Sequence, residues 1–314
     1  MTAVIDSTRT TQLLEALAPV VADNLDRHVS VAREWMPHDY VPWSEGRDFA
    51  FLGGEDWEPG DSRLDPVAKA SMILNLLTED NLPSYHRAIA TVFGRDGAWG
   101  EWVNRWTAEE ARHGIAIRDY LVVTRGVDPV DLERRRMAHM STGYIGRAPS
   151  MLHDLAYVSF QELATRVSHR NTGKATGCPL ADQLLARIAT DENLHMVFYR
   201  NLLNAAFELA PDETMRAVAD EVVGFEMPGT SAPEFARAAA QIATAGIYDL
   251  RLHHDDVVQP VLRFWRVFDR ADLGAEGERA REELAGYLSV LDAKASQFTE
   301  RREALRARQA ARAA

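Results

Sequence analysis

Apolar side chains recur every three to four positions along most of the chain, which is the period of an α-helix that buries one face. Alternating runs of valine, isoleucine and threonine, which would indicate β-strands, are scarce. An aspartate followed by a proline marks two helix starts, at Asp65-Pro66 and Asp128-Pro129, because the aspartate caps the first turn and the proline gives up no hydrogen bond there. The pattern predicts an all-α protein.

Interruptions in this pattern divide the chain into four long helices and several shorter ones. The interruptions fall near residues 52–64, 93–98, 125–128, 142–149, 171–179 and 227–233. The long helices are expected at 66–92, 98–124, 149–170 and 180–207. Further helices are expected near 8–30, 129–141, 212–226, 232–246, 250–268 and 276–308. No change of composition marks a boundary, so we expect a single domain over residues 1–314 with a core bundle at 66–207.

The composition is that of a protein able to bury a large core, with 314 residues of which 46% are hydrophobic and 26% charged. The net charge of −12 disfavours a nucleic-acid binder, because phosphate contacts require a concentrated positive field. No segment resembles a signal peptide or approaches roughly eighteen uninterrupted apolar residues, so we expect no membrane span. The single cysteine, Cys178, excludes a disulfide within the chain, and we expect a cytoplasmic protein.

Two Glu-x-x-His steps, Glu110…His113 and Glu192…His195, lie within expected long helices. Residues three apart share one face of a helix, so each step aims a carboxylate and an imidazole at the same point. One such step arises easily by chance in an acidic chain, where it would be an ion pair on a solvated face. In both steps, however, a second acid precedes the glutamate in mid-helix, where its charge would be costly without compensation.

A lone glutamate precedes each step by a nearly constant interval, since Glu79 lies 31 positions before Glu110 and Glu162 lies 30 positions before Glu192. Two carboxylates together with two Glu-x-x-His pairs make the ligand set of di-iron and di-manganese proteins built on a ferritin-like four-helix bundle. Thiolates, which would favour zinc or a cluster, are absent from this set. We therefore predict two iron ions, with electrons from outside because the sequence offers no site for an internal redox cofactor.

Three residues near the expected ligands have candidate roles. Pro83 cannot donate a hydrogen bond to the carbonyl of Glu79, so it would kink the helix at this ligand or mark a helix end. Thr165 lies one turn beyond Glu162, where its hydroxyl would face oxygen species at the metal or bond back to its own helix. Asp191 would accept a hydrogen bond from a ligand histidine, or remain a surface acid.

At these residues the sequence resembles the soluble acyl-ACP desaturases, the family of plant stearoyl-ACP desaturase and its actinobacterial relatives. The matching segments around the ligands are LLTEDNLPSYH, RWTAEEARHG, SFQELATRVSHRNTG and IATDENLHMVFY. Those outside the ligands are EWMPHDYVPW, FEMPGTSAPEF and GIYDL. The resemblance extends from residue 33 to residue 268.

The resemblance implies a complete ligand set and a reaction. The six ligands that it carries over are Glu79, Glu110, His113, Glu162, Glu192 and His195. Trp35 matches a tryptophan that is proposed to pass electrons to the iron through Asp191 and His113. The implied reaction uses O2 and two electrons to remove two hydrogens from a saturated acyl chain in fatty acid biosynthesis, leaving a cis double bond. The implied partners are acyl carrier protein with its acyl chain, a ferredoxin-type electron donor and a second copy of the chain in a homodimer.

The sequence departs from the plant pattern in features that concern recognition. It has no transit peptide, its loop 171–179 is shorter, and residues 269–314 have no counterpart. Docking of an acidic carrier protein would require a basic surface, for which two arginine groups are candidates, although both are also typical of solvated helix faces. The groups are Arg134, Arg135 and Arg136, and Arg301, Arg302, Arg306, Arg308 and Arg312.

Two other kinds of function are compatible with the ligand set. One is a different di-iron oxygenase or oxidase, such as a ferroxidase or a radical-generating subunit. The other is a non-catalytic homologue that binds an acyl carrier. The segments FEMPGT and GIYDL disfavour the first, because they match the desaturases outside the ligand set.

Overall fold

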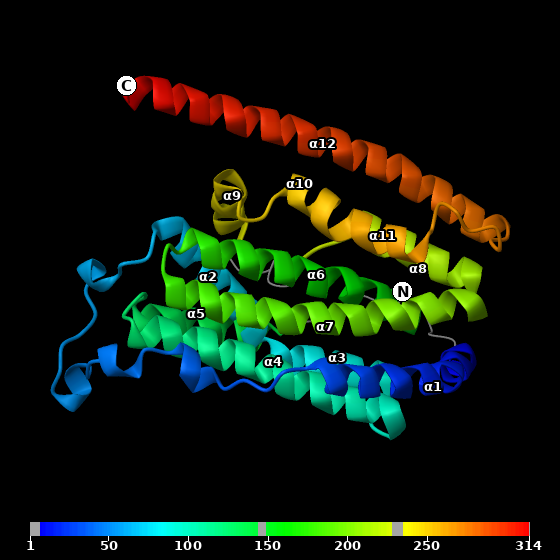
Figure 1. Cartoon of the computed structure of the whole chain (residues 1–314), viewed down its shortest axis with the longest axis horizontal. Helices are drawn as coiled ribbons and strands as arrows, with labels where there is room; N and C mark the ends of the chain where they lie inside the picture. The colour runs from blue at the N-terminus through cyan, green and yellow to red at the C-terminus, as the bar shows by residue number, and fades with distance from the viewer. Residues whose placement is uncertain (1–6, 144–148, 228–234, 314) are drawn as a thin grey trace.

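The computed structural model of the chain describes residues 7–143, 149–227 and 235–313, and every regular element within these residues is a helix. Figure 1 shows the long helices lying roughly along one axis, with the first and last helices on opposite sides of the molecule. The predicted all-α class is confirmed. None of the helices in the described part carries a stretch long and apolar enough to cross a membrane. Most of the FEMPGTSAPEF segment and the start of the helix expected at 232–246 lie outside the described residues.

Four helices form the core bundle, as predicted. They are α2 (Pro66–Asp80), α4 (Gly97–Val123), α6 (Met151–Ala175) and α7 (Pro179–Leu209). The most extensive contact joins α6 to α7, while α2 packs against α4 and α6, and α4 packs against α7. The carboxylate of Asp65 accepts a hydrogen bond from the Val67 N–H at 2.8 Å, and that of Asp128 accepts one from the Val130 N–H at 2.9 Å. These caps fix the starts of α2 and of α5 (Pro129–Thr142) where the sequence placed them.

The helix expected at 66–92 is two helices, because the chain breaks at Asn81 between α2 and α3 (Leu82–Phe93). Pro83 lies in the first turn of α3, where its missing N–H costs nothing. Of the two alternatives predicted for this proline, the structure therefore matches the helix end and not the kink. Glu79 consequently lies in the last turn of α2, next to the break.

The loop expected at 171–179 was wrong in its extent, because α6 continues to Ala175 and only residues 176–178 connect it to α7. Gly173 lies inside α6 at a position where an added Cβ would come too close to Asp182 of α7. The connection is short because Gly177 adopts φ 64°, a left-handed conformation that glycine takes without strain.

The remaining helices cover the bundle. They are α1 (Ser7–Val31), α8 (Pro211–Val223), α9 (Phe235–Ala245), α10 (Leu250–Leu252), α11 (Gln259–Trp265) and α12 (Ala275–Ala313). Figure 1 shows α1 along the side of the bundle near α4 and α7, and α12 outside α8. The helix expected at 250–268 is divided by a π-helical turn at His253–Val258, and it ends early because Arg266 takes a left-handed φ of 54°.

The segment between α1 and α2 projects from one end of the bundle and returns (Figure 1). It contains the short 3-10 helices η1 (Pro37–Tyr40), η2 (Trp43–Glu45), η3 (Ala50–Leu52) and η4 (Pro59–Asp61). Arg125, just after α4, holds its far part by donating to the carboxylate of Asp61 at 2.8 Å and to the carbonyl of Asp56 at 2.7 Å. At its near end η1 packs against α4 and α7, and Trp35 is buried beside it.

The buried apolar side chains form two separate clusters, and α4 and α7 pass from one to the other at the same level. At this level the first cluster ends with Trp106 in α4 and Met196 in α7, and the second cluster ends with Ala116 in α4 and Ile188 in α7. Between them lies a buried layer of acids and histidines, which includes both Glu-x-x-His steps.

Candidate metal centre

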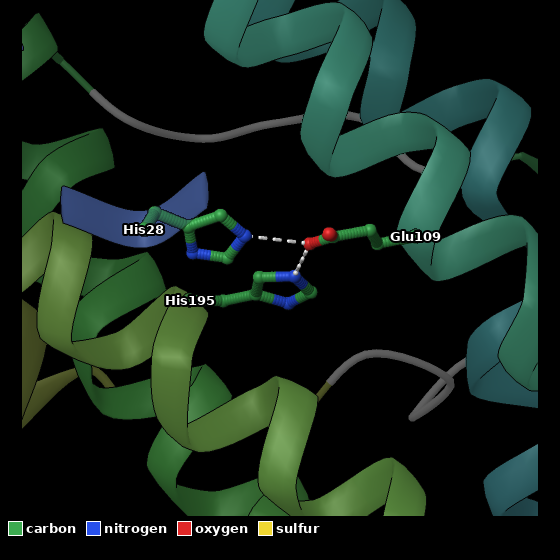
Figure 2. Close-up of side chains that lie close together, drawn as sticks. All are labelled: His28, Glu109 and His195. Carbon is green, nitrogen blue, oxygen red and sulfur yellow. Dashed lines mark hydrogen bonds and ion pairs between the residues drawn. The ribbon is translucent and has the colours of Figure 1, made fainter. Parts of the chain in front are cut away.

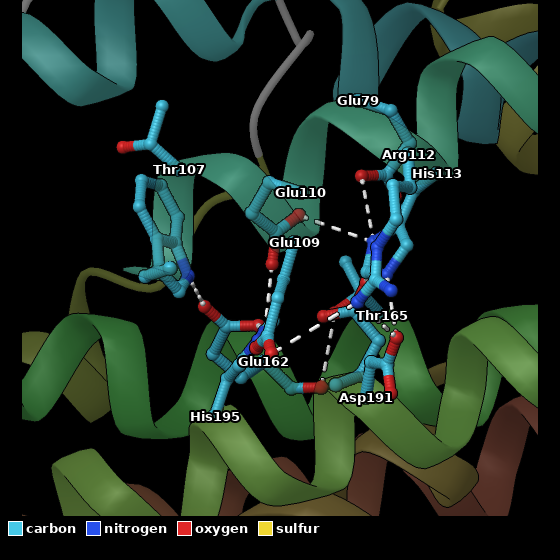
Figure 3. Close-up of polar contacts among 12 residues, drawn as sticks. Glu79, Thr107, Glu109, Glu110, Arg112, His113, Glu162, Thr165, Asp191 and His195 are labelled. Atoms are coloured by element: carbon cyan, nitrogen blue, oxygen red, sulfur yellow. Dashed lines mark hydrogen bonds and ion pairs between the residues drawn. The ribbon is translucent and has the colours of Figure 1, made fainter. Parts of the chain in front are cut away.

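Six side chains from the four bundle helices meet in this polar layer (Figure 3). They are Glu79 in α2, Glu110 and His113 in α4, Glu162 in α6, and Glu192 and His195 in α7. None exposes more than 7% of its surface. Residues three apart project from one face of a helix, so each Glu-x-x-His step contributes an acid and an imidazole to the same space. The structure thus brings together every residue that the sequence predicted as a metal ligand.

The six side chains form two overlapping groups of four. One group comprises Glu79, Glu110, His113 and Glu192, and the other comprises Glu110, Glu162, Glu192 and His195. In each group the ligand atoms lie within 4.8 Å of one another. Glu110 and Glu192 belong to both groups. Two cations bound here would therefore share two carboxylates and have two further ligands each.

The inner atoms of these side chains point at one another. Nδ1 of His113 lies 3.2 Å from Glu192 Oε1 and 3.3 Å from Glu110 Oε2. Nδ1 of His195 lies 2.7 Å from Glu110 Oε1 and 3.7 Å from Glu162 Oε2. Both nitrogens, and an oxygen from each of these three glutamates, are buried without a hydrogen-bond partner among the described residues. Buried polar atoms are rarely left unpaired, so their convergence fits residues that bind a cation.

The carboxylates dominate the electrostatics of the layer. Burial and the neighbouring carboxylates raise the pKa of Glu162 well above its usual value. Burial alone would lower the pKa of His113 and of His195, but the nearby acids, Glu110 for the first and Glu109 for the second, outweigh it and raise both. The layer therefore favours positive charge at its centre, as a cation site does.

Asp191 lies directly behind His113. The oxygen Oδ2 of Asp191 is 3.5 Å from His113 Nε2, and it accepts a hydrogen bond of 2.7 Å from Trp35 Nε1. The rings of Trp35 and His113 are nearly parallel, at 17°, with centroids 6.3 Å apart. Burial would raise the pKa of Asp191, but the contact with His113 and the nearby cations lower it to about 2, so this acid is ionised. The three residues that the sequence linked are in contact.

Glu109 lies behind His195 in the same way, and the sequence interpretation did not assign it. Its Oε2 accepts hydrogen bonds from His195 Nε2 and from His28 Nε2, each at 2.9 Å (Figure 2). Burial would raise the pKa of Glu109, but these two hydrogen bonds hold it well below its usual range. A signal for Glu109 was present, because an acid precedes the ligand glutamate in both steps. His28 offered none, because it lies 81 positions away in α1.

The carboxylates at the two ends of the layer each have one outer partner. Nε2 of His169 lies 2.9 Å from Oε1 of Glu79, and Nε1 of Trp106 donates a hydrogen bond of 3.0 Å to Oε1 of Glu162. Each partner comes from the helix of the opposite half, His169 from α6 and Trp106 from α4. These contacts orient the two carboxylates, and the sequence interpretation had not included His169.

The hydroxyl of Thr165 contacts its own helix, as one interpretation predicted, and it also faces a carboxylate of the polar layer. Oγ1 lies 2.9 Å from the carbonyl of Glu162 and 3.1 Å from that of Gln161, within its own helix. It also lies 3.1 Å from Oε2 of Glu192, one of the two shared carboxylates. Because a hydroxyl has one hydrogen to donate, Thr165 can donate it to only one of these three oxygens at a time.

A cavity between α3 and α6 reaches the carboxylates of the polar layer. Its walls include apolar side chains such as Leu82 and Val158, and all four carboxylates of the layer contribute to its lining. Asp154 also lines it, two helical turns before Glu162 in α6. Burial, together with a neighbouring glutamate, raises the pKa of Asp154 to about 7.

The first predicted arginine group is largely engaged within the protein. Arg135 forms an ion pair of 2.8 Å with Asp131, and Arg136 forms one with Asp80 across to α2. Arg134 is exposed and has no ion pair among the described residues.

The second group lies on α12. Arg302 and Arg306 donate hydrogen bonds to the end of α9 and the turn that follows, so they tie α12 to the body of the protein. Arg301 and Arg308 are exposed, whereas the side chain of Arg312 lies outside the described residues.

Comparison with known proteins gives concordant matches over most of the chain. A family model described as fatty acid desaturase matches residues 9–313, so the expectation that residues 269–314 have no counterpart in the family was wrong. DesA1 of Mycobacterium tuberculosis, whose name assigns it to the acyl-[acyl-carrier-protein] desaturases, is 54% identical over 295 residues, which are 91% of this chain and 87% of DesA1. Acyl-[acyl-carrier-protein] desaturase 4 of rice, a chloroplastic protein, is 34% identical over 281 residues, covering 80% of this chain and 67% of the rice protein.

A solved structure matches as well. The X-ray structure of DesA2 from Mycobacterium tuberculosis H37Rv, described as an acyl-ACP desaturase, superimposes with a TM-score of 0.69 at 32% sequence identity. The match covers 81% of this chain and 95% of DesA2. The helical architecture is therefore shared with a protein of similar sequence.

Proposed function

The chain belongs to the fatty acid desaturase family, and from this premise we propose that it is a di-iron enzyme that introduces a cis double bond into a saturated acyl chain carried by acyl carrier protein. The observation that carries the proposal is the pair of overlapping four-residue groups that share Glu110 and Glu192. The names of the relatives support the substrate class, because bacterial and plant members alike are named for acyl-[acyl-carrier-protein].

Iron fits the donor set better than the common alternatives. Carboxylates with imidazoles and no thiolate are typical of iron or manganese, whereas structural zinc sites prefer cysteine and histidine. With both histidines neutral, the four carboxylates carry four negative charges, which two divalent ions balance. When bound, the iron pair supplies, with O2, the oxidising power that side chains lack.

The ligand roles follow from the two groups. Glu110 and Glu192 would contact both ions, Glu79 and His113 would complete one site, and Glu162 and His195 would complete the other. The reaction balances when the acyl chain loses two hydrogens, an external donor gives two electrons, two protons are taken up, and O2 becomes two molecules of water.

The cavity between α3 and α6 is suited to hold the acyl chain. It lies alongside the helices that carry Glu79 and Glu162, and its walls are mainly apolar. The carboxylates of the polar layer contribute to its lining, so a chain within it would pass the metal centre on this side. The protein's contribution would be to hold two adjacent methylene carbons at the centre and to keep water away from them.

Electrons would enter through Trp35 and Asp191 towards His113. Support for this path comes from the 2.7 Å hydrogen bond between Trp35 and Asp191 and from the near-parallel rings of Trp35 and His113. The donor would be a ferredoxin-type protein, in the absence of any sequence motif for an internal redox cofactor.

Acyl carrier protein would dock on a basic surface. Arg134, Arg301 and Arg308 support such a surface because they are exposed, whereas most of the other candidate arginines are engaged in contacts within the chain. We also propose a homodimer, as the resemblance to the desaturases implies.

The proposal is tested with iron-loaded protein, O2, a reduced ferredoxin system and stearoyl-ACP. We expect a monounsaturated product, detected by mass spectrometry of the released acyl chains, and a parallel reaction with stearoyl-CoA identifies the carrier. Glu110→Ala should abolish the product, whereas Glu101→Ala, which removes an exposed glutamate from the same helix, should not. This pair separates loss of the centre from a general effect on α4.

The rival functions give different results in the same experiment. A hydroxylated product would indicate another di-iron oxygenase. Acyl carrier protein that binds without turnover would indicate a non-catalytic homologue. If protein that holds two iron ions repeatedly yields no alkene product, the desaturase proposal is wrong.

A further inference from the structure

A histidine from outside the bundle reaches the polar layer. His28 lies in α1 and exposes 1% of its surface, and Figure 2 shows it facing Glu109 from the side opposite α4. Its Nε2 donates a hydrogen bond of 2.9 Å to Oε2 of Glu109. Its Nδ1 has no hydrogen-bond partner among the described residues, so Glu109 is the only hydrogen-bond partner of His28 within them. A buried imidazole with a single hydrogen-bond partner indicates that this hydrogen bond has a role in the protein.

The same oxygen of Glu109 also receives Nε2 of His195 at 2.9 Å. A carboxylate that accepts two hydrogen bonds at one oxygen requires a hydrogen on both nitrogens, so His195 carries its hydrogen on Nε2. Nδ1 of His195 is then the nitrogen with a free lone pair, and it faces Oε1 of Glu110 at 2.7 Å. Glu109 thereby selects the tautomer and the ring orientation in which His195 can bind a metal ion.

Ring packing fixes the position of His28 in turn. The rings of His28 and His195 are stacked at 21° with centroids 5.8 Å apart, and Trp102 meets His28 edge-on at 5.1 Å. Trp102 is itself stacked against Phe198 of α7. The anchor of His28 is therefore the first hydrophobic cluster, which lies on the His195 side of the layer.

Two simpler interpretations of this arrangement fail on geometry. Glu109 also forms an ion pair with Arg105, but a counter-ion for a half-exposed arginine does not require two buried histidines on its other oxygen. His28, Glu109 and His195 also form a group able to hold a metal ion of their own. Nδ1 of His195, however, faces the carboxylates, and both contacts to Glu109 have hydrogen-bond lengths.

We propose that Glu109 and His28 are positioning residues that hold His195 ready to bind one of the two metal ions, so that α1 completes a site otherwise built by the bundle. The inference rests on the proposed di-metal centre and adds to it the residues that set the affinity of one ion. Partners of this kind, placed behind a ligand histidine, typically contribute about 10- to 100-fold to metal affinity.

The test is a titration of the metal-free full chain with cobalt(II), and anaerobically with iron(II), by calorimetry and visible absorption. We expect the wild type to bind two ions. Glu109→Gln and His28→Ala should each lower the affinity for one ion by about 10- to 100-fold and leave the affinity for the other ion unchanged. His28→Gln should restore much of the affinity, because its amide can donate to Glu109 from a similar position.

Two further variants separate positioning from a general loss of structure. In a His195→Ala background, which already lacks that ion, Glu109→Gln should have no additional effect on binding. His86→Ala is a matched control, because it removes another histidine that contacts α4, at Thr107 Oγ1 with 2.8 Å, away from the polar layer. It should bind both ions as the wild type does.

The outcomes distinguish the two proposals. Wild-type affinity for both ions in Glu109→Gln would overturn the inference, as would equal weakening of both ions. This variant preserves side-chain volume and decides the matter if His28→Ala does not fold. Fewer than two ions bound by the wild type would overturn the di-metal centre and this inference together.

Discussion

The two halves of the metal centre follow one plan. In the first half His113 of α4 turns Nδ1 to the carboxylates and Nε2 to Asp191 of α7. In the second half His195 of α7 does the same with Glu109 of α4. Each acid directly precedes the ligand glutamate of the opposite helix, so the two Glu-x-x-His helices orient each other's histidines.

The two halves differ in the residue that contacts the acid, Asp191 or Glu109, on the side away from the ligand histidine. In the first half Asp191 contacts Trp35, whose ring has the guanidinium groups of Arg112 and Arg187 at 5.0 Å and 5.9 Å. In the second half the corresponding place is taken by His28, which packs against Trp102 in the hydrophobic cluster. If the two proposals hold, Trp35, a buried ring beside two cations, receives electrons, and His28, a ring packed on Trp102, fixes the geometry of His195. One helical frame would then support two different tasks.

The largest effect on bound iron should come from removing a carboxylate that both halves share. Glu110→Ala takes a ligand from both groups of four, so we expect bound iron to fall from two ions per chain to nearly none, and activity with it. Glu162→Ala takes a ligand from one group only and should leave one ion. Iron is measured by elemental analysis after gel filtration. Equal losses in the two variants would mean that the centre is not divided as proposed.

Trp35→Phe should break the first half while leaving the second intact. The variant keeps a ring but loses the 2.7 Å hydrogen bond to Asp191. Changing an outer partner of a ligand histidine typically costs about 10- to 100-fold in activity, so reduction of the iron by ferredoxin should slow by about tenfold or more. Stopped-flow absorbance measures the reduction, and bound iron should stay at two ions per chain.

The matched variant is Trp102→Phe, which changes the ring that packs on His28 in the second half. It should reduce at a rate close to that of the wild type, because no electron path is proposed there. If both tryptophan variants slow reduction equally, the distinction between the halves is wrong.

The candidate ligands could be predicted from the sequence because helix geometry determines which residues share a face. Residues three apart in α4 and α7 must share a face, and the repeated interval to Glu79 and Glu162 places two more acids at the same level of the bundle. The same periodicity gave three of the four core helices with errors confined to their ends, but it did not reveal that the helix expected at 66–92 is two helices.

Residues that act across the bundle could not be predicted in the same way. His28 contacts Glu109 across 81 positions, and His169 contacts Glu79 across 90, and no local pattern connects such pairs. Local sequence patterns also gave a wrong prediction where packing between helices determines the local structure. A loop was expected at 171–179, yet Gly173 lies inside α6, where the close approach of α7 favours a residue without a side chain.

The metal centre and the cavity shift the pKa of a buried aspartate in opposite directions. The pKa of Asp191 is lowered to about 2, whereas burial raises that of Asp154 to about 7, well above its usual 3.8. Between pH 4 and pH 7 the folded protein therefore binds a proton at Asp154 that the unfolded chain does not, so this group lowers stability as pH rises. Asp154→Asn should remove that loss.

We expect Asp154→Asn to be more stable than the wild type at pH 8 by about 1–3 kcal/mol, and nearly equal to it at pH 4. The expected gain is less than the full shift would give, because the side chain keeps some exposure. Urea unfolding of the metal-free protein at the two pH values measures the difference. A gain of the same size at both pH values would contradict the raised pKa.

Thr165→Val should give the smallest effect, and it concerns a point at which the two halves are unequal. Thr165 follows Glu162 by three positions, whereas the residue three positions after Glu79 is Leu82, so only one half places a hydroxyl beside the shared Glu192. Removing one hydrogen bond costs about 1 kcal/mol, and part of this one already goes to the helix backbone. We therefore expect both iron ions to be retained and turnover to fall several-fold, with Thr165→Ser close to the wild type. If Thr165→Val turns over at the wild-type rate, the hydroxyl serves only its own helix, and the two halves differ at His28 and Trp35 but not at the carboxylates.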